Sequence, residues 1–250
     1  MRILAGACVV VAVATAGALP LAAQQETSGR GFLFGAPNVA VTVRAGYAAA
    51  RAGSDVFSFV TDELTLRKGD FGSFAGGADI AVSLHPHVDL VLSVDNAGMR
   101  KRSEFREWED TDGNPIEQET SFSRLTYAAA VRYYLIPKGR SLGRLAWVPA
   151  RYTPWLSVGV GRTAYNFNQN GDFIDFDKGN SVFHDTFKSS QWTTSAQLGA
   201  GVDWTLNQRF SLGTQVKYLF GKADLSYDFS GFAPIDLSGA SLTGGITMRF

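Results

Sequence analysis

Several residue types are scarce in this sequence, and each scarcity narrows the class of protein. The only cysteine, Cys8, lies in an apolar N-terminal run, so the chain beyond that run can form no disulfide. Further along, no stretch approaches the roughly 18 consecutive apolar residues that a transmembrane helix needs. Only three histidines are present, which leaves few candidates for a catalytic base.

An excess of one charge is also missing. The chain has 23 basic and 23 acidic residues, and removal of Arg2 with the N-terminal segment would leave 22 basic and 23 acidic residues. A nucleic-acid partner would require a basic excess, so we expect none.

The N-terminus has the layout of a secretory signal peptide. Arg2 precedes an apolar run over Ile3–Ala18, and small residues lead to Ala23. We therefore expect a signal peptide over 1–23, a short periplasmic lead over 24–37, and one folded unit over 38–250. A retained membrane helix is the alternative, but the run is short for a span of roughly 20 residues.

The last nine residues alternate strictly between two kinds of side chain. One face of the expected strand is apolar and ends in an aromatic residue: Leu242, Gly244, Ile246, Met248 and Phe250. The other face is small or polar: Thr243, Gly245, Thr247 and Arg249. A membrane barrel turns such an apolar face towards lipid and the polar face towards its lumen.

Seven earlier segments share this alternation, at 38–48, 72–84, 88–94, 122–135, 155–164, 192–206 and 209–220. The pattern predicts an all-β fold, a closed eight-stranded antiparallel up-and-down transmembrane β-barrel. We expect long extracellular loops at 49–71, 98–121, 165–191 and 221–238, and short periplasmic turns. The 136–154 connection is longer than a periplasmic turn should be.

The same register assigns charged side chains to the lumen. A slip by one residue would turn several of them towards lipid, at about 2–4 kcal/mol each near the midplane. The lumen set is Arg44, Asp79, Asp89, Asp95, Arg124, Arg132, Asp203, Lys217 and Arg249. We expect Asp89, Arg132, Asp203 and Arg249 to pair near the periplasmic end, and Arg249 to lie beside Arg44 at the barrel seam. A hydrated lumen without specific pairs is the alternative.

Over roughly 38–250 the chain resembles the small eight-stranded outer-membrane barrels, such as the OmpA transmembrane domain and the OmpX and Ail proteins. The resemblance rests on the alternating segments, the loop pattern and the terminal Phe250, not on invariant residues. It implies a location in the bacterial outer membrane among lipid and lipopolysaccharide. It also implies that Leu242, Ile246, Met248 and Phe250 form the signal read by the barrel assembly machinery.

Some barrels of this kind modify lipid A and need a nucleophile and a base. Here His85 and His87 fall in a predicted periplasmic turn, and His184 stands beside Asp185 with Ser181 nearby. Adjacent residues on a strand point to opposite faces, so His184 and Asp185 form no dyad by spacing. We therefore expect no enzyme activity and no cofactor.

Two loop tips carry alternating acids before glycine, around Asp110 and Asp112 and around Asp175 and Asp177. Such tips could wrap Ca²⁺, but neither has the full EF-hand spacing, and hairpin turns use the same residues. We therefore predict no metal site.

The 136–154 connection interleaves arginines with Trp147 and other apolar residues. One hypothesis places it on the periplasmic membrane surface with the indole in lipid; the alternative is a folded turn that caps the barrel.

The predicted function is that of a non-enzymatic integral outer-membrane protein, structural or surface-binding through its long loops. An eight-stranded barrel is just filled by side chains, which disfavours a wide pore. A narrow channel and a lipid-A-modifying enzyme are the alternatives. A soluble lipocalin-like binder is disfavoured, because its apolar face would point inward.

Overall fold

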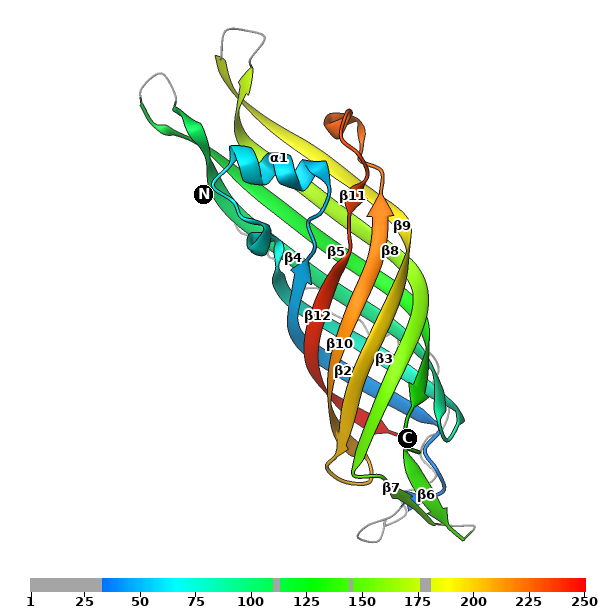
Figure 1. Cartoon of the computed structure of the whole chain (residues 1–250). Coiled ribbons are helices and arrows are strands. Elements are labelled where there is room, and N and C mark those ends of the chain that lie inside the picture. The colour runs from blue at the N-terminus through cyan, green and yellow to red at the C-terminus, as the bar shows by residue number, and fades with distance from the viewer. Residues whose placement is uncertain (1–32, 110–112, 144–145, 176–180) are drawn as a thin grey trace, which may run out of the picture.

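Eight antiparallel strands form a closed ring in the computed structural model, which describes residues 33–109, 113–143, 146–175 and 181–250 (Figure 1). The ring strands are β2 (Val39–Ala50), β3 (Ser73–His85), β4 (Val88–Glu109), β5 (Pro115–Tyr134), β8 (Tyr152–Asp175), β9 (Ser181–Thr205), β10 (Phe210–Ala223) and β12 (Gly239–Arg249). Each strand pairs with the next along the chain, and β12 closes the ring on β2. The predicted eight-stranded up-and-down barrel is confirmed.

Shorter elements lie at the two ends of the ring. The loop end carries α1 (Asp55–Glu63), η1 (Lys68–Phe71), η3 (Tyr227–Phe229) and β11 (Ile235–Asp236). The turn end, where β12 also finishes, carries β1 (Leu33–Phe34), β6 (Gly139–Leu142) and β7 (Ala146–Pro149) (Figure 1). Within the described ranges, no helix combines the length and the apolar character needed to cross a bilayer.

The outer surface of the ring is apolar, as the alternation predicts. On β12, the side chains of Leu242, Ile246 and Phe250 are 55–58% exposed, whereas Thr243 and Thr247 on the opposite face are buried. Exposed aliphatic side chains continue this surface around the ring, among them Val43, Ile80, Leu92, Val131, Val158, Leu198 and Val216. A soluble protein would bury such a belt, so the inverted pattern identifies a surface that faces lipid.

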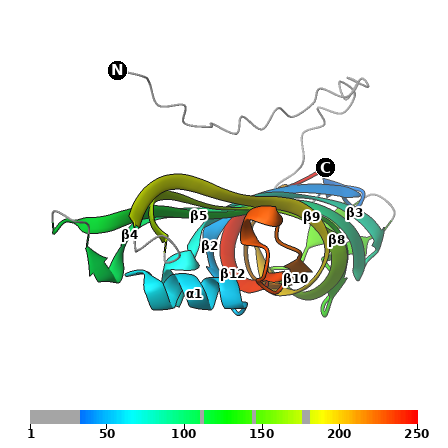
Figure 2. The ribbon, with the colours of Figure 1, turned by 90° about the horizontal axis from the view of Figure 1, so that it is seen from above.

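Two of the predicted loops are wrong, because the chain continues as paired strand beyond the lipid-facing belt. Within the predicted loops 98–121 and 165–191, residues 98–109 and 115–121 belong to β4 and β5, and residues 165–175 and 181–191 belong to β8 and β9; the four strands have 20 to 25 residues each. A strand needs only about 9–11 residues to cross a bilayer. The extensions 98–109, 115–123, 165–175 and 181–191 pair side by side, and we call this four-stranded sheet the blade. It runs out to one side of the ring (Figure 2).

The 49–71 and 221–238 connections are also more ordered than the loop prediction implied. The first holds α1 and η1, and the second holds η3 and β11. Their apolar side chains pack against the inner face of the blade in a cluster that we call the apolar cap. It contains Ala52, Val56, Phe57, Val60, Leu64, Leu66, Phe71, Phe122, Tyr165, Phe167, Ala223, Phe229, Ile235 and Leu237.

Phe57 lies at the centre of the apolar cap. Its ring meets those of Phe71, Phe122 and Phe167 edge to face, with centroid separations of 4.7, 5.3 and 5.8 Å. These separations lie in the range preferred by aromatic pairs. The cap therefore joins α1 and η1 to strands β5 and β8 of the blade.

Candidate functional site

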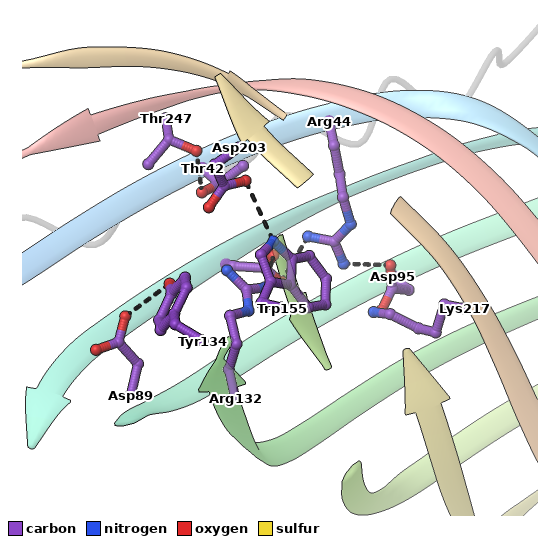
Figure 3. Close-up of polar contacts among 11 residues, drawn as sticks. Thr42, Arg44, Asp89, Asp95, Arg132, Tyr134, Trp155, Asp203, Lys217 and Thr247 are labelled. Atoms are coloured by element: carbon purple, nitrogen blue, oxygen red, sulfur yellow. Dashed lines mark hydrogen bonds and ion pairs between the residues drawn. The ribbon is translucent and has the colours of Figure 1, made fainter. Parts of the chain in front are cut away.

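Charged side chains from four strands meet in the middle of the lumen (Figure 3). Arg44 on β2 lies between Asp79 on β3, at 2.5 Å, and Asp95 on β4, with which it also forms an ion pair. Lys217 on β10 binds the other oxygen of Asp95 at 2.7 Å.

A fifth strand adds Arg132, on β5, which approaches Asp79 at 3.5 Å. We call these five residues, Arg44, Asp79, Asp95, Arg132 and Lys217, the ionic layer. Three cations thus share two carboxylates across the width of the barrel.

Glycines on the neighbouring strands make room for Arg44. Arg44 is paired with Gly77 on β3 and with Gly245 on β12. A Cβ at Gly77 would stand 2.8 Å from Oδ1 of Asp95, and one at Gly245 would stand 2.8 Å from the Cβ of Arg44. Real Cβ atoms do not approach so closely, so these two glycines allow the arginine to lie across the lumen.

A second polar group lies towards the turn end. Asp89 accepts a hydrogen bond of 2.9 Å from the hydroxyl of Tyr134 and forms an ion pair with Lys138. Lys138 also donates to the hydroxyl of Ser83 at 2.7 Å. Lys138 stands in the 136–154 connection, outside the alternating segments, so the sequence pattern did not assign it to the lumen.

Asp203 has a different partner from the one predicted. The indole Nε1 of Trp155 donates to its carboxylate at 3.3 Å, and the guanidinium of Arg132 stacks over the same indole at 4.0 Å (Figure 3). Trp155 thus links a cation and a carboxylate. The alternation alone could not reveal this link. Trp155 is the first residue of its alternating segment, and the other lumen-facing residues of that segment are small.

The predicted pairing at the turn end is wrong in detail. Among the described residues, no ion pair joins any two of Asp89, Arg132, Asp203 and Arg249. Arg132 instead reaches Asp79, and Asp89 is taken by Lys138. Within that part of the chain, the side chain of Arg249 forms a 3.2 Å hydrogen bond to the hydroxyl of Thr205.

The predicted seam contact between Arg249 and Arg44 is also wrong. Arg249 stands opposite Ala40, whereas Arg44 stands opposite Gly245, four residues further along the same strand pair. A rise of about 3.3 Å per residue separates the two positions by about 13 Å along the strand. The seam is closed by backbone pairing from Gly239 to Arg249, with the two arginines at different heights.

Arg124 connects the lumen to the apolar cap. Its guanidinium donates to the backbone carbonyl of Leu237 at 2.5 Å and lies 5.6 Å from the ring centroid of Phe122. Leu237 is fully buried. Arg124 is therefore held above the ionic layer, against the segment that closes the loop end.

The space inside the barrel is small except at one end. Between Arg44, Trp155 and Asp203 the cavity volume is about 20 Å³, and a cavity beside Asp95 and Lys217 measures about 50 Å³. One water requires about 10–15 Å³ of such volume, so these spaces hold a few waters at most rather than a solute. A third cavity of about 340 Å³ lies at the turn end.

The 136–154 connection is a β-hairpin of β6 and β7, and β7 also pairs with β1. Trp147 is buried and lines the turn-end cavity, so the hypothesis that its indole enters lipid is wrong. The hairpin folds over the barrel end, which is the alternative that the sequence left open. The nearby residues 144 and 145 lie outside the described part of the chain.

The candidate catalytic and metal residues remain scattered. His184 Nδ1 lies 2.8 Å from Asp172 rather than from Asp185, and both side chains are exposed near the blade tip. His85 and His87 stack on each other at the turn end. The proposed calcium tips include residues 110–112 and 176–180, which lie outside the described residues. Among the residues that are described, no cluster of three metal-ligating side chains occurs.

Comparison with solved structures identifies the architecture. A major outer-membrane protein from Thermus thermophilus aligns with a TM-score of 0.51 at 14% identity, over 86% of this chain and 100% of that one. The chain has the fold of the small outer-membrane β-barrels. The outer-membrane protein OprG from Pseudomonas aeruginosa (TM-score 0.47, 13% identity, 87% and 99% covered) and the Neisserial surface protein NspA (0.44, 13%, 85% and 97%) also match.

No protein-family model and no curated protein matches the sequence. The barrel fold and its lipid-facing belt together place the protein in a bacterial outer membrane. In such barrels the short turns are periplasmic and the longer connections extracellular, so we expect the blade and the apolar cap on the outer side.

Proposed function

We propose that this is a non-enzymatic integral outer-membrane protein that uses the blade as a saccharide-binding surface next to the membrane. The observation that carries the proposal is the outer face of the blade, which is polar in the rows nearest the barrel. It rises directly from the outer rim of the lipid-facing belt, where lipopolysaccharide presents its sugars and phosphates. The nearest ligand of this class is therefore the lipopolysaccharide core.

The polar side chains of the blade form rows across the four strands. Register places Arg100, Ser121, Asn168 and Lys188 side by side, from β4 to β9. The next row outward contains Arg102, Glu119, Asn170 and Thr186. Amides and hydroxyls can both donate and accept hydrogen bonds, as sugar hydroxyls do, and the cations at the row ends suit phosphate.

An aromatic pair marks where this face begins. Tyr127 and Trp192 stack at a centroid separation of 6.0 Å, and both are about half exposed. Aromatic residues of this kind gather at the boundary between lipid and head groups. Arg162, paired with Tyr127 across β5 and β8, stands at the same level. On β9, Lys188 lies four residues beyond Trp192, so both rows stand outside the lipid boundary.

The interior of the barrel supports a structural role with a closed lumen. The ionic layer fills the middle of the barrel, and the apolar cap covers the loop end. These features support a closed barrel over a narrow channel. In planar bilayers we expect conductance at the background level, and stable single-channel steps from the wild-type protein would contradict this part of the proposal.

The alternative of an enzyme would require a nucleophile, a base and an orienting carboxylate in contact with one another. His184 and Asp172 provide a base and an orienting carboxylate, but among the described side chains no serine or cysteine hydrogen-bonds to His184. Lipid A from cells with and without the protein should therefore have the same mass spectrum. A change in acyl chain number that disappears in the variant His184→Gln would establish the enzyme instead.

The saccharide proposal is tested with purified protein in a zwitterionic detergent. Binding is measured for lipopolysaccharide with a complete core and for lipid A without sugars. We expect the core to increase affinity about tenfold, and the double variant Arg100→Gln, Lys188→Gln to lose that increase. Arg140→Gln, which changes an exposed arginine at the turn end, is the matched control. Equal affinity for both lipids would contradict the proposal.

The final strand would serve assembly. Leu242, Ile246 and Phe250 present a continuous apolar edge to the outside at the strand that closes the ring. Met248 lies on the same face of β12, between Ile246 and Phe250. We propose that the barrel assembly machinery recognises this edge. Replacing Phe250 with Ser should lower the folded fraction in the outer membrane, as measured by heat-modifiable gel migration.

A further inference from the structure

The turn end differs from the loop end in its surface charge. Its described residues outside the ring strands are 33–38, 86–87, 135–143, 146–151, 206–209 and 250. They include no aspartate or glutamate, but they hold four cations, Lys138, Arg140, Arg151 and Arg209. At the loop end, by contrast, the 51–72 connection alone carries four carboxylate side chains. The turn end therefore presents an unbalanced positive surface.

The carboxylates that lie near this end are already engaged. Inside the barrel, Asp89 binds Lys138, and Asp203 accepts the indole N–H of Trp155. One oxygen of the chain-terminal carboxylate, at Phe250, accepts two backbone N–H groups at the start of β2, at 2.9 and 3.3 Å. Among the residues that the structure describes, no carboxylate forms an ion pair with any of the three exposed arginines of the turn end.

One of these arginines, Arg151, is directed towards the lipid-facing surface of the barrel. Its guanidinium carbon lies 5.4 Å from the ring centroid of Tyr152, within the range of a cation–π contact. Tyr152 is the first residue of β8, and its ring lies 5.3 Å from that of Trp204 on β9. Both rings are about half exposed on the outer surface. Aromatic side chains gather in this way where hydrocarbon meets head groups, so Arg151 stands at head-group level.

The backbone holds Arg151 in this position. Its carbonyl accepts the N–H of Thr205 at 3.0 Å, and the hydroxyl of Thr205 donates to the carbonyl of Ala150 at 2.7 Å. A guanidinium that stacks over a ring keeps its in-plane N–H groups available, and these can bind two phosphate oxygens side by side. Arg151 therefore presents hydrogen-bond donors directly beside an apolar aromatic surface.

A second exposed arginine, Arg209, lies across the neighbouring turn between β9 and β10. Its backbone N–H donates to the side-chain oxygen of Asn207 at 2.9 Å, which fixes the turn. Thr205, which bonds to Arg151, stands opposite Ser211, two residues beyond Arg209. Strand spacing and rise per residue then place the Cα atoms of the two arginines about 12 Å apart. Two side chains of this length can approach the same head group.

The combination of two unpaired arginines with two lipid-facing rings selects among ligands. A zwitterionic head group carries a cation beside its phosphate, and that cation would meet the arginines. An anionic head group such as that of phosphatidylglycerol carries no such cation, and basic sites at the membrane surface bind anionic lipids for this reason. A free phosphate ester would leave the aromatic surface uncovered. Charge and position therefore both favour an anionic phospholipid.

We propose that Arg151, Tyr152, Trp204 and Arg209 form a binding site for an anionic phospholipid of the periplasmic leaflet. The phosphate accepts hydrogen bonds from the two arginines, and the glycerol and acyl chains lie against the two rings. The leaflet follows from the expected orientation of the barrel, with its short turns in the periplasm. The site lies at the opposite end of the barrel from the blade, so the proposal stands independently of saccharide binding.

The test compares phosphatidylglycerol with phosphatidylcholine of the same acyl chains. Equal amounts of both lipids are added to the folded full-length protein in zwitterionic detergent, and native mass spectrometry counts the lipids that stay bound. We expect about fivefold greater retention of phosphatidylglycerol, and a smaller preference in about 0.5 M ammonium acetate, because salt screens exposed charges. Glycerol 3-phosphate in about tenfold excess should not displace the lipid, because it lacks the acyl chains that cover the rings.

Variants then locate the site, each first shown to be folded by heat-modifiable gel migration. Arg151→Gln should lower the preference to about twofold or less, and Arg209→Gln should lower it by a smaller amount. Arg151→Lys keeps the charge but loses the paired donors, so it should retain part of the preference. Arg140→Gln is the matched control. Arg140 is exposed in the β6–β7 hairpin, beyond the ends of the ring strands, and its change should leave the preference as it is (Figure 1).

Three results would overturn the proposal. One is equal retention of the two lipids by the wild-type protein. Another is a loss of preference in Arg140→Gln as large as that in Arg151→Gln, which would show that the overall positive charge of the turn end attracts the lipid. Displacement of phosphatidylglycerol by glycerol 3-phosphate would show that the arginines take a soluble phosphate ester instead.

Discussion

The barrel is closed twice, by the ionic layer in the middle and by the apolar cap at the loop end, and the two closures are built in opposite ways. In the ionic layer, every charged residue stands on a ring strand, at a height fixed by backbone pairing. In the apolar cap, much of the contact surface comes from α1, η1 and the η3–β11 segment, which fold back from the connections.

The two closures should therefore fail differently. Loss of a charge in the ionic layer leaves other buried charges without partners, and the strands cannot move away from them. Loss of a side chain in the apolar cap leaves a cavity, and the connecting segment can respond by opening locally. The first change should act on the whole barrel, and the second on the loop end alone.

The largest expected effect is that of Asp79→Ala. Asp79 receives both Arg44 and Arg132, so its removal leaves two buried guanidinium groups short of a carboxylate. We expect a loss of about 3–5 kcal/mol in the free energy of unfolding, measured by urea titration in liposomes. Asp185→Ala, on the exposed part of the blade, should change it by less than about 0.5 kcal/mol. A loss below about 1 kcal/mol for Asp79→Ala would contradict the idea of a rigid ionic layer.

Phe57→Ala should have the next largest effect, confined to the loop end. Phe57 is fully buried among three aromatic rings, and Phe→Ala changes in cores cost about 3 kcal/mol or more. We expect amides of α1 and η1 to exchange faster by an amount equivalent to about 3 kcal/mol, while barrel unfolding stays unchanged. Phe59→Ala, about half exposed on the same helix, is the control. An equal loss in barrel unfolding would remove the distinction between the two closures.

The sequence predicted the ionic layer better than the apolar cap, for a physical reason. Side chains alternate between the two faces of a strand, so the position of Arg44 or Asp95 in the alternation determines whether it points to the lumen or to lipid. Their partners could not be predicted, because they depend on the stagger of the strands. The partner of Asp89 was missed for another reason: it is Lys138, which stands in the 136–154 connection outside the alternating segments. The lumen positions followed from the pattern, whereas the individual ion pairs required the structure.

The blade and the helix α1 were missed for a related reason. Residues of the blade such as Asn166, Asn168 and Asn170 are polar, so the apolar alternation stops where lipid ends although the backbone pairing continues. The α1 segment has only nine residues, which is short for a helical period to emerge. Its helix is stabilised by Phe57 packing on strands that are distant in sequence.

A smaller effect is expected for Trp155→Phe, which tests how the ionic layer is joined to the turn end. The change removes the Nε1 donor to Asp203 and keeps an aromatic ring near Arg132. We expect a loss of about 1–2 kcal/mol in barrel unfolding, the value of one hydrogen bond to a charged group. Trp192→Phe removes an indole from the outer surface instead and should cost less than about 0.5 kcal/mol. Equal losses would mean that the indole contributes only its surface area.

The smallest expected effect concerns pH at the rim of the apolar cap. Asp70 in η1 binds Lys101 at 2.5 Å and accepts the backbone N–H of Arg67 at 2.9 Å. The hydrogen bond from Lys101, followed by that from Arg67, lowers the pKa of Asp70 below its usual range. A carboxylate with a lowered pKa stabilises the folded form above its unfolded pKa of about 3.9. This contribution to stability disappears as the pH falls through the pKa that Asp70 has in the folded protein.

Because this pair is largely in contact with solvent, its contribution should be below about 1 kcal/mol and should weaken in high salt. The measurement is hydrogen exchange of the amides over 67–72 between pH 5 and pH 2.5, corrected for intrinsic rates. We expect opening to increase at the acid end in the wild type, and Asp70→Asn to remove this pH dependence without affecting barrel unfolding. If the ionic layer instead loosened first in the same acid range, the strand-built closure would be the weaker of the two, and the comparison between them would be reversed.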